Sequence, residues 1–330
     1  MNEIIEDFLE NGFVKIRNTV EPDLCQDLME QFKKLRPIDE DFFKENVYMK
    51  EEEYDPEKTA RKTGPSEGNN LVENVNLDFI EKNENVQGAI SSILGSNYKI
   101  INKKFVMGVP KNFIPKWIIK EIDDMPSANL CQFVKPEYRN MTYFHGIDFH
   151  MDIVDHKNRV GDLITLYVYI DGVDKNMSPL FVVPKSHVFG ALPFPHDIEI
   201  LNKNSMTFSN GKGKSKDLNF NMLTGTAGSI WFWSAYTLHG TQPTYETNVP
   251  RVSLRYIIER EKSSEELPID KFLKEIDGDL TLTTTRKYED NPDETIHVGS
   301  KLKTALDHQS NQANYLMISK KNRDLHLRDT

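Results

Sequence analysis

The amino-acid sequence predicts a mainly β fold with flanking helices, whose core is a double-stranded β-helix, that is, a jelly roll or cupin-like core. Two observations predict it. Residues 3–36 are patterned as helix, strand and helix, whereas from residue 98 on the chain consists of short strand-like runs separated by Gly, Pro and Asn. Short strands bury their apolar faces by packing as two layers, and the helices are expected to buttress these layers.

The predicted organisation is a single domain over residues 1–330. It comprises N-terminal helical support over residues 1–97, a jelly-roll core over about 98–259, and a helical and irregular extension over 260–330. A chain of 330 residues is long enough to bury one large core.

The N-terminal elements follow from apolar periodicity and from turn-forming residues. Within residues 3–36, the second helix is expected to begin near Pro22, because proline suits the first helical turn and apolar residues recur at helical spacing from Leu24 on. Residues 49–70 are polar and rich in turn formers, which predicts a loop. Helical patterns return around residues 77–94.

The predicted core consists of strands interrupted by one long insertion. Strands are expected where the sequence is apolar or alternates in polarity, over residues 98–109, 130–135, 161–171 and 230–238. A further strand, which returns beside the last of these, is expected to start at Pro250. Residues 190–222 are polar and predict a long surface loop. A charged helix over 265–276 and an irregular tail complete the chain.

Three side chains are candidate metal ligands. His150 and Asp152 are two residues apart, and in a strand such side chains point to the same face. His239 follows the aromatic run 230–238 and can supply a third ligand. Two histidines and one carboxylate on one side of a metal leave the opposite positions open, as in non-haem Fe(II) oxygenases. Open positions are what O2 and a chelating co-substrate require.

The chain resembles the phytanoyl-CoA dioxygenase-like (PhyH) family of Fe(II)/2-oxoglutarate-dependent oxygenases over residues 6–259. The resemblance rests on four segments that occur in the same order as in the family, residues 8–24, 150–152, 163–187 and 225–254. The third segment includes the turn Pro184-Lys185-Ser186-His187, in which Lys185 stands in place of the family's Gly. Four ordered motifs are far more specific than a His-x-Asp tripeptide alone. The resemblance implies Fe(II), 2-oxoglutarate as co-substrate and O2.

A co-substrate site is expected beside the metal. Arg251 begins the return strand after His239, and its guanidinium matches the far carboxylate of 2-oxoglutarate in two hydrogen bonds. The resemblance implies that Thr241 donates a hydroxyl to the same co-substrate and that Tyr167 lies beside it. Period two places Thr165, Tyr167 and Tyr169 on one strand face, which is expected to line the site.

The expected reaction is oxidation, most simply hydroxylation, of an unactivated C–H bond of a small metabolite, with release of succinate and CO2. By the resemblance, the carboxylate of Asp152 favours hydroxylation over halogenation, because related halogenases have a small residue at that position. Desaturation and oxidative cyclisation stay open. A cupin-like metalloenzyme that does not use 2-oxoglutarate would need the same three ligands but has no reason for Arg251. A catalytically silent binding protein has no reason to keep all three ligands.

Two further residues are candidate substrate contacts. Period two puts Arg255 on the same side as Arg251, where it can bind an anionic substrate group, whereas the alternative is an internal ion pair with Asp148 or Asp162. Gln132 can hydrogen-bond substrate or co-substrate, or simply satisfy backbone groups.

Composition limits the partners. The net charge of −10 argues against nucleic acid, and no apolar run reaches the roughly 20 residues of a membrane span. The acidic start is unlike a secretion signal, and Cys25 and Cys131 are too few for a disulfide framework. A small-molecule substrate and a cytoplasmic location are therefore expected, with no nucleic-acid or membrane partner and with the oligomeric state left open.

Overall fold

The computed structural model describes most of the chain, namely residues 2–16, 20–55, 65, 68–122, 130–241, 248–261, 264–287, 293, 295–298 and 301–304. Within these ranges no helix has the length and apolar character needed to cross a membrane.

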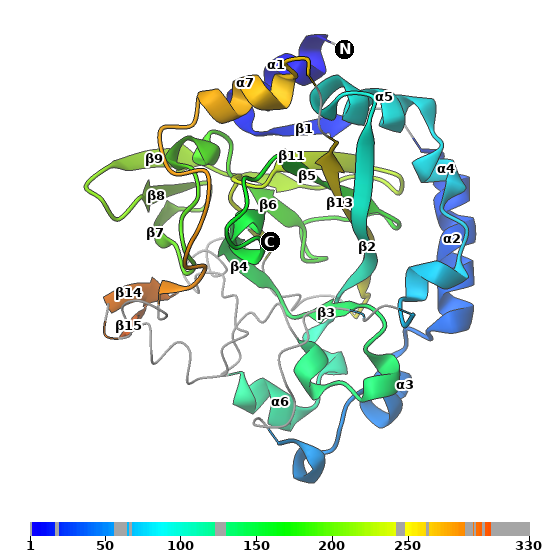
Figure 1. The fold of residues 1–330 in the computed structure, drawn as a ribbon. Helices are drawn as coiled ribbons and strands as arrows, with labels where there is room; N and C mark the ends of the chain where they lie inside the picture. Colours follow the sequence, from blue (N-terminus) through cyan, green and yellow to red (C-terminus); the bar gives the residue numbers. More distant parts are fainter. Residues whose placement is uncertain are drawn as a thin grey trace.

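Two sheets form the centre of the protein (Figure 1). The larger sheet has six strands in the order β1 (Phe13–Ile16), β11 (Ile230–Ser234), β5 (Leu163–Tyr169), β13 (Arg251–Arg260), β2 (Tyr98–Gly108) and β3 (Thr142–Phe144). The smaller sheet has four strands in the order β10 (Asn221–Leu223), β6 (Leu180–Val182), β12 (His239–Thr241) and β4 (Ile147–His150). Pairing within both sheets is antiparallel except between β2 and β3.

Two smaller sheets lie beside this centre. One has three strands, β7 (Asp197–Asn202), β8 (Ser205–Ser209) and β9 (Ser215–Asn219), and the other is the hairpin of β14 (Thr295–Val298) and β15 (Lys301–Thr304). The helices are α1 (Asn2–Asn11), α2 (Pro22–Leu35), α3 (Glu40–Phe42), α4 (Asp78–Glu81), α5 (Glu84–Leu94), α6 (Lys116–Glu121) and α7 (Pro268–Lys274). Figure 1 shows α1, α5 and α7 together at one end of the sheets and α2 alongside β2.

Helix α5 illustrates how local sequence sets the element boundaries. The side chain of Asn83 accepts hydrogen bonds from the backbone N–H groups of Asn85 and Val86, which have no partner inside the helix. The helix ends at Gly95, whose φ of 81° suits glycine because it lacks a Cβ.

The two faces of the large sheet have different roles. On β5, Ile164, Leu166 and Val168 join the main hydrophobic core, to which the helices also contribute. Phe32 of α2, for example, packs against Phe105 of β2 with ring centroids 4.9 Å apart. The alternate side chains of β5 point inward, toward the smaller sheet. This inner face lines the site described below.

The structure confirms the predicted mainly β jelly roll with flanking helices. The predicted helices around residues 77–94 correspond to α4 and α5, and the strand predicted over 98–109 corresponds to β2. Helix α7 lies within the charged segment 265–276. The single-domain organisation stays a prediction. Much of the C-terminal tail lies outside the described residues, as do residues 242–247 of the turn expected after His239.

Three predicted elements were wrong. Residues 130–135 were expected to form a strand, but Leu130–Phe133 is a buried 3₁₀ helix, because so short a mainly apolar run carries no period that separates strand from helix. The run 230–238 is not one strand: β11 ends at Ser234. A buried turn follows, whose apolar side chains conceal the break. Residues 190–222 contain the sheet of β7, β8 and β9 instead of a plain loop.

Candidate metal centre

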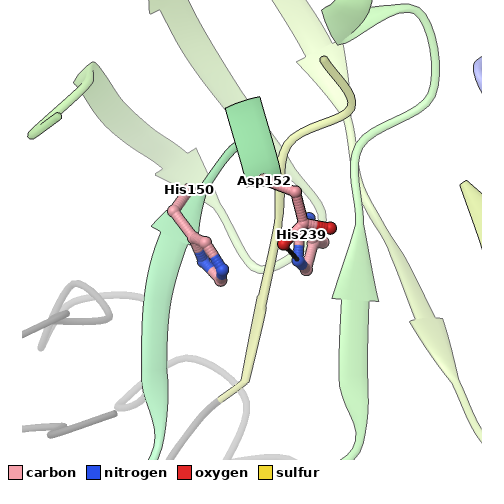
Figure 2. Close-up of side chains that lie close together, drawn as sticks. All are labelled: His150, Asp152 and His239. Atoms are coloured by element: carbon pink, nitrogen blue, oxygen red, sulfur yellow. Dashed lines mark ion pairs between the residues drawn. The ribbon is translucent and has the colours of Figure 1, made fainter. Parts of the chain in front are cut away.

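Strand pairing in the smaller sheet brings the two candidate histidines together. His239, the first residue of β12, lies directly opposite His150, the last residue of β4, and their ring centroids are 4.3 Å apart. Side chains directly opposite on antiparallel strands are neighbours by construction. Figure 2 shows both imidazoles beside Asp152, and ligand atoms of all three residues lie within 4.8 Å of one another.

Asp152 reaches the histidines from just beyond the strand. Contrary to the expectation that one strand carries both residues, β4 ends at His150, and Asp152 begins a 3₁₀ helix over Asp152–Asp155. Met151 between them is still extended, so the predicted same-side placement is preserved. A hydrogen bond from the N–H of Ile153 to the carbonyl of Ala235 fixes this turn against the segment that precedes His239.

Both imidazoles are oriented by backbone carbonyls. Nδ1 of His150 lies 2.9 Å from the carbonyl oxygen of Asp148, and Nδ1 of His239 lies 3.0 Å from that of Thr237. A protonated Nδ1 that donates to a carbonyl leaves the lone pair on Nε2, which is the common arrangement for metal-bound histidine. Nε2 of His239 lies 3.7 Å from Oδ1 of Asp152.

The carboxylate of Asp152 is held at both oxygens. Oδ2 accepts hydrogen bonds from the hydroxyl of Thr165 at 2.5 Å and from Nε1 of Trp233 at 3.0 Å. Oδ1 accepts a hydrogen bond from Nη2 of Arg255 at 2.6 Å. Only 1% of Asp152 is exposed to solvent, so these bonds determine how the carboxylate is presented.

Electrostatics favour a ligand set that is ready for a metal. Burial lowers the pKa of His239 to about 3 and lowers that of His150 below its usual value. Burial alone would raise the pKa of Asp152, but Arg255 and the two imidazoles outweigh it and hold that pKa below its usual range. At neutral pH the site therefore contains two neutral imidazoles and one carboxylate, a donor set that fits a divalent iron.

Arg251 is a fully buried cation beside this set. It is 0% exposed, and its three guanidinium nitrogens have no hydrogen-bond partner among the described residues. The guanidinium carbon lies 4.9 Å from the ring centre of Phe144, 5.6 Å from that of Tyr167 and 5.5 Å from that of Tyr169. Aromatic faces stabilise a cation only in part, so a buried fork of unused donors indicates a missing anionic partner.

Further polar atoms with unused hydrogen-bonding capacity belong to the same region. The hydroxyl groups of Thr241, Tyr167 and Ser253 are buried without a partner among the described residues. Thr241 follows His239 on β12 by two positions, and Ser253 follows Arg251 on β13 by two. The ring of Tyr167 stacks on Trp233 at 5.8 Å, which links the Arg251 region to Asp152. Together these atoms fit a small, oxygen-rich co-substrate.

The two candidate substrate contacts are placed differently. Arg255 points inward as expected, but its partner is Asp152 and not the expected Asp148 or Asp162. Asp162 instead accepts a hydrogen bond from Arg260. Gln132 is 3% exposed and its Nε2 has no partner among the described residues, but it lies on a 3₁₀ helix and not on the strand that was expected.

Sequence reasoning missed two residues that support the candidate metal ligands. Trp233 donates to Asp152 and packs against the ring of His239 at 4.6 Å. The alternation of Trp231 and Trp233 on β11 was the available signal. His196 accepts a hydrogen bond from the N–H of Met151, between the two ligands of the motif, and nothing in its local sequence indicates this contact.

Comparison with known proteins extends these observations. The family model described as phytanoyl-CoA dioxygenase (PhyH) matches residues 8–251. No match was found among curated proteins.

Similar solved structures include three proteins of low sequence identity. The non-heme alpha-ketoglutarate-dependent epimerase SnoN from nogalamycin biosynthesis is 13% identical, with a TM-score of 0.46 over 78% of this chain and 82% of that chain. AviO1 from Streptomyces viridochromogenes is 14% identical, with a TM-score of 0.45 over 80% and 96%. EctD from S. alaskensis, solved with 2-oxoglutarate and 5-hydroxyectoine, is 10% identical, with a TM-score of 0.45 over 79% and 76%.

Proposed function

Because the chain belongs to the phytanoyl-CoA dioxygenase (PhyH) family and is an Fe(II)- and 2-oxoglutarate-dependent oxygenase, we propose that it hydroxylates an unactivated C–H bond of a small, anionic metabolite, releasing succinate and CO2. Fe(II), 2-oxoglutarate and O2 are the cofactor and co-substrates of this chemistry. When bound, they supply the oxidising power that no protein side chain provides.

His150, Asp152 and His239 are the proposed iron ligands. Three features support them: the ligand atoms lie within 4.8 Å of one another, Nδ1 and not Nε2 of each imidazole faces a backbone carbonyl, and Arg255 and the imidazoles hold the pKa of Asp152 below its usual range. Three ligands on one side leave room for a bidentate co-substrate and O2. Oδ2 of the carboxylate already accepts two hydrogen bonds, from Thr165 and Trp233, whereas Oδ1 accepts one, from Arg255. Oδ1 therefore keeps a lone pair and is the proposed metal-binding oxygen.

The single observation that carries the proposal is Arg251. A fully buried guanidinium without a hydrogen-bond partner is costly unless an anion completes it. The far carboxylate of 2-oxoglutarate is such an anion, and its two oxygens match the guanidinium fork. The unused hydroxyls of Thr241 and Tyr167 are proposed to donate to the same carboxylate. A cupin-like enzyme without 2-oxoglutarate has no use for this arrangement.

The protein's own part in the reaction is positioning and exclusion of water. Aromatic residues of the inner face, Tyr167, Tyr169, Trp231 and Trp233, are each at most 3% exposed and surround the co-substrate region with apolar surface. Such walls strengthen electrostatic contacts and keep water from the reacting groups. Hydroxylation requires in addition that the substrate carbon be held close to the metal.

Substrate recognition is assigned to Arg255 and, less directly, to Gln132. The side chain of Arg255 is 16% exposed and reaches the metal ligand Asp152, so a substrate anion bound there would lie beside the iron. Desaturation and oxidative cyclisation need the same binding and differ in how the substrate is held after the C–H bond breaks. The identity of the product distinguishes them.

The proposal is tested under anaerobic conditions by adding Fe(II) and then 2-oxoglutarate to the full chain. A weak visible charge-transfer band of the metal–co-substrate chelate is expected in the wild type and is expected to weaken strongly in Arg251→Met. Iron that binds without producing the band at any 2-oxoglutarate concentration would refute co-substrate binding. That result would favour a cupin-like metalloenzyme.

A further inference from the structure

Lys104 is an inward-facing cation opposite Arg255. Strands β2 and β13 pair so that Lys104 lies across from Arg255, Val106 across from Ser253, and Gly108 across from Arg251. Cross-strand partners point to the same face, and the face that carries Arg251 and Arg255 is the face of the metal centre. Lys104 and Arg255 are therefore neighbours on the inward face of the sheet, and Arg255 donates a hydrogen bond to Asp152.

The ammonium group of Lys104 has no hydrogen bond or ion pair among the described residues, and Lys104 as a residue is partly buried. Its neighbour Lys103 points to the other face and forms an ion pair with Glu81 at 2.7 Å. Burial lowers the pKa of Lys104 to about 8, and the positive charge of Arg255 adds to this effect. Like charges directly opposite on neighbouring strands destabilise a sheet, so this pairing is not explained by stability.

The carboxylates nearby offset only part of the charge of the two cations, because Asp152 supplies one negative charge and pairs with Arg255. Asp152 is shared between the hydroxyl of Thr165, the indole of Trp233 and Arg255, and it is the proposed metal ligand. The side chain of Asp155 is 61% exposed, and its ion pair, at 3.6 Å, is with Arg286. Positive charge therefore remains unmatched on a partly exposed surface next to the metal centre.

Resting on the proposed function, we propose that Lys104 and Arg255 form a two-cation receptor for a doubly charged oxyanion on the substrate, of the phosphate-monoester type. A single carboxylate is satisfied by one guanidinium, whereas a tetrahedral dianion has the charge and the oxygens for both groups. Arg255 offers a planar fork and Lys104 a compact point charge. Arg255 of the receptor contacts Asp152, so an anion bound there would be separated from the iron only by this ligand's side chain.

The receptor is tested with inorganic sulfate, a tetrahedral dianion that keeps Fe(II) in solution. The full chain is loaded anaerobically with Fe(II) and 2-oxoglutarate and treated with limiting acetic anhydride at pH 8, with sulfate or with chloride at equal ionic strength. Acetylation of each lysine is then measured by mass spectrometry. We expect sulfate to slow acetylation of Lys104 several-fold and to leave that of Lys103 unchanged. Equal acetylation of Lys104 in both salts overturns the proposal.

Matched variants give a second, independent measurement. The affinity for sulfate is obtained from the shift of the melting temperature, which cancels general salt effects when variants are compared at the same concentration. Lys104→Gln is expected to weaken sulfate binding about tenfold to a hundredfold, since a hydrogen bond between charged groups is removed. Lys103→Gln is the control and is expected to bind sulfate as the wild type does. Equal sulfate affinity in all three proteins contradicts the receptor.

The two proposals fail in different ways. The charge-transfer band of the wild type, recorded in the same samples, tests co-substrate binding whatever the outcome of the sulfate measurements. If Lys104→Gln does not fold, Lys104→Arg replaces it, and this variant is expected to retain sulfate binding because it keeps the charge. Loss of sulfate binding in Lys104→Arg would count against a charge-based receptor.

Discussion

Replacing Arg251 with Met tests the co-substrate anchor most directly. The side chain is 0% exposed, and its guanidinium nitrogens have no partner among the described residues, so the change removes no hydrogen bond that the protein itself makes. Methionine keeps an unbranched chain against the rings of Phe144, Tyr167 and Tyr169. A change in 2-oxoglutarate binding is therefore attributable to the lost fork of donors.

The expected magnitude follows from two charge-assisted hydrogen bonds. Each such bond contributes about 1.5–3 kcal/mol, and about 1.4 kcal/mol corresponds to a factor of ten in affinity. The dissociation constant of 2-oxoglutarate is thus expected to rise about a hundredfold to ten-thousandfold. Arg251→Lys keeps the charge but not the planar fork, and we expect it to bind with intermediate affinity.

Thermal unfolding with and without 2-oxoglutarate, in the presence of Mn(II), measures this effect. At a ligand concentration one hundred times the wild-type dissociation constant, ligand binding stabilises the wild type by about 2.7 kcal/mol. A variant with hundredfold weaker binding retains only about 0.4 kcal/mol at the same concentration. The comparison is made within each protein, so a change in the stability of the ligand-free variant does not affect it. Equal ligand-dependent stabilisation in Arg251→Met would refute the anchor.

Three further predictions concern the ligand support and the scaffold. Thr165→Ala and Trp233→Phe each remove a hydrogen bond that orients the carboxylate of Asp152, and each is expected to weaken Mn(II) binding about tenfold to a hundredfold in equilibrium dialysis. Unchanged Mn(II) affinity in these variants would show that the hydrogen bonds do not support the metal site. Gly240→Ala is expected to abolish Mn(II) binding and lower the melting temperature, because an added Cβ would lie 2.8 Å from the carbonyl oxygen of Ile147 and separate β12 from β4. Burial lowers the pKa of His187 to about 4, whereas in the unfolded chain histidine has its ordinary pKa of about 6.5. The unfolded state therefore binds the proton first, and wild-type stability is expected to fall by up to about 3 kcal/mol between pH 6.5 and 4. His187→Gln should lose this part of the dependence in denaturant titrations, and an identical pH profile in both proteins would exclude it.

The sequence predicted those parts of the site that depend on local periodicity. Period two on β5 placed Thr165 and Tyr167 on one face, and the structure has the hydroxyl of Thr165 on Asp152. The same rule on β13 placed Arg255 inward with Arg251. The ligand set of His150, Asp152 and His239 was also proposed from spacing, and the structure brings the three side chains together.

Features that depend on strand register could not be predicted from the sequence. His239 opens a new strand, and only the pairing of β12 with β4 places it opposite His150. Lys103 and Lys104 look alike in the sequence, and only the pairing of β2 with β13 shows that one points outward and the other inward. A shift of one residue would exchange their roles, so register determines which lysine belongs to the site.

The distribution of charge connects these register effects to binding. Arg251, Ser253 and Arg255 of β13 point inward, as do the residues of β2 that lie opposite them. These described side chains include three cations, namely Arg251, Arg255 and Lys104, and no carboxylate. With Fe(II) bound, these charges are opposed by Asp152 and by the two charges of 2-oxoglutarate. Two positive charges are then left without a matching negative charge, and an anionic substrate bound beside Lys104 would neutralise them. Because burial raises the energetic cost of unmatched charge, each anion that binds relieves repulsion felt by the others. Binding of 2-oxoglutarate and of an anionic substrate is therefore coupled through the same field. High ionic strength is expected to weaken anion binding at the partly exposed Lys104 more than at the buried Arg251, and to weaken the coupling between the two.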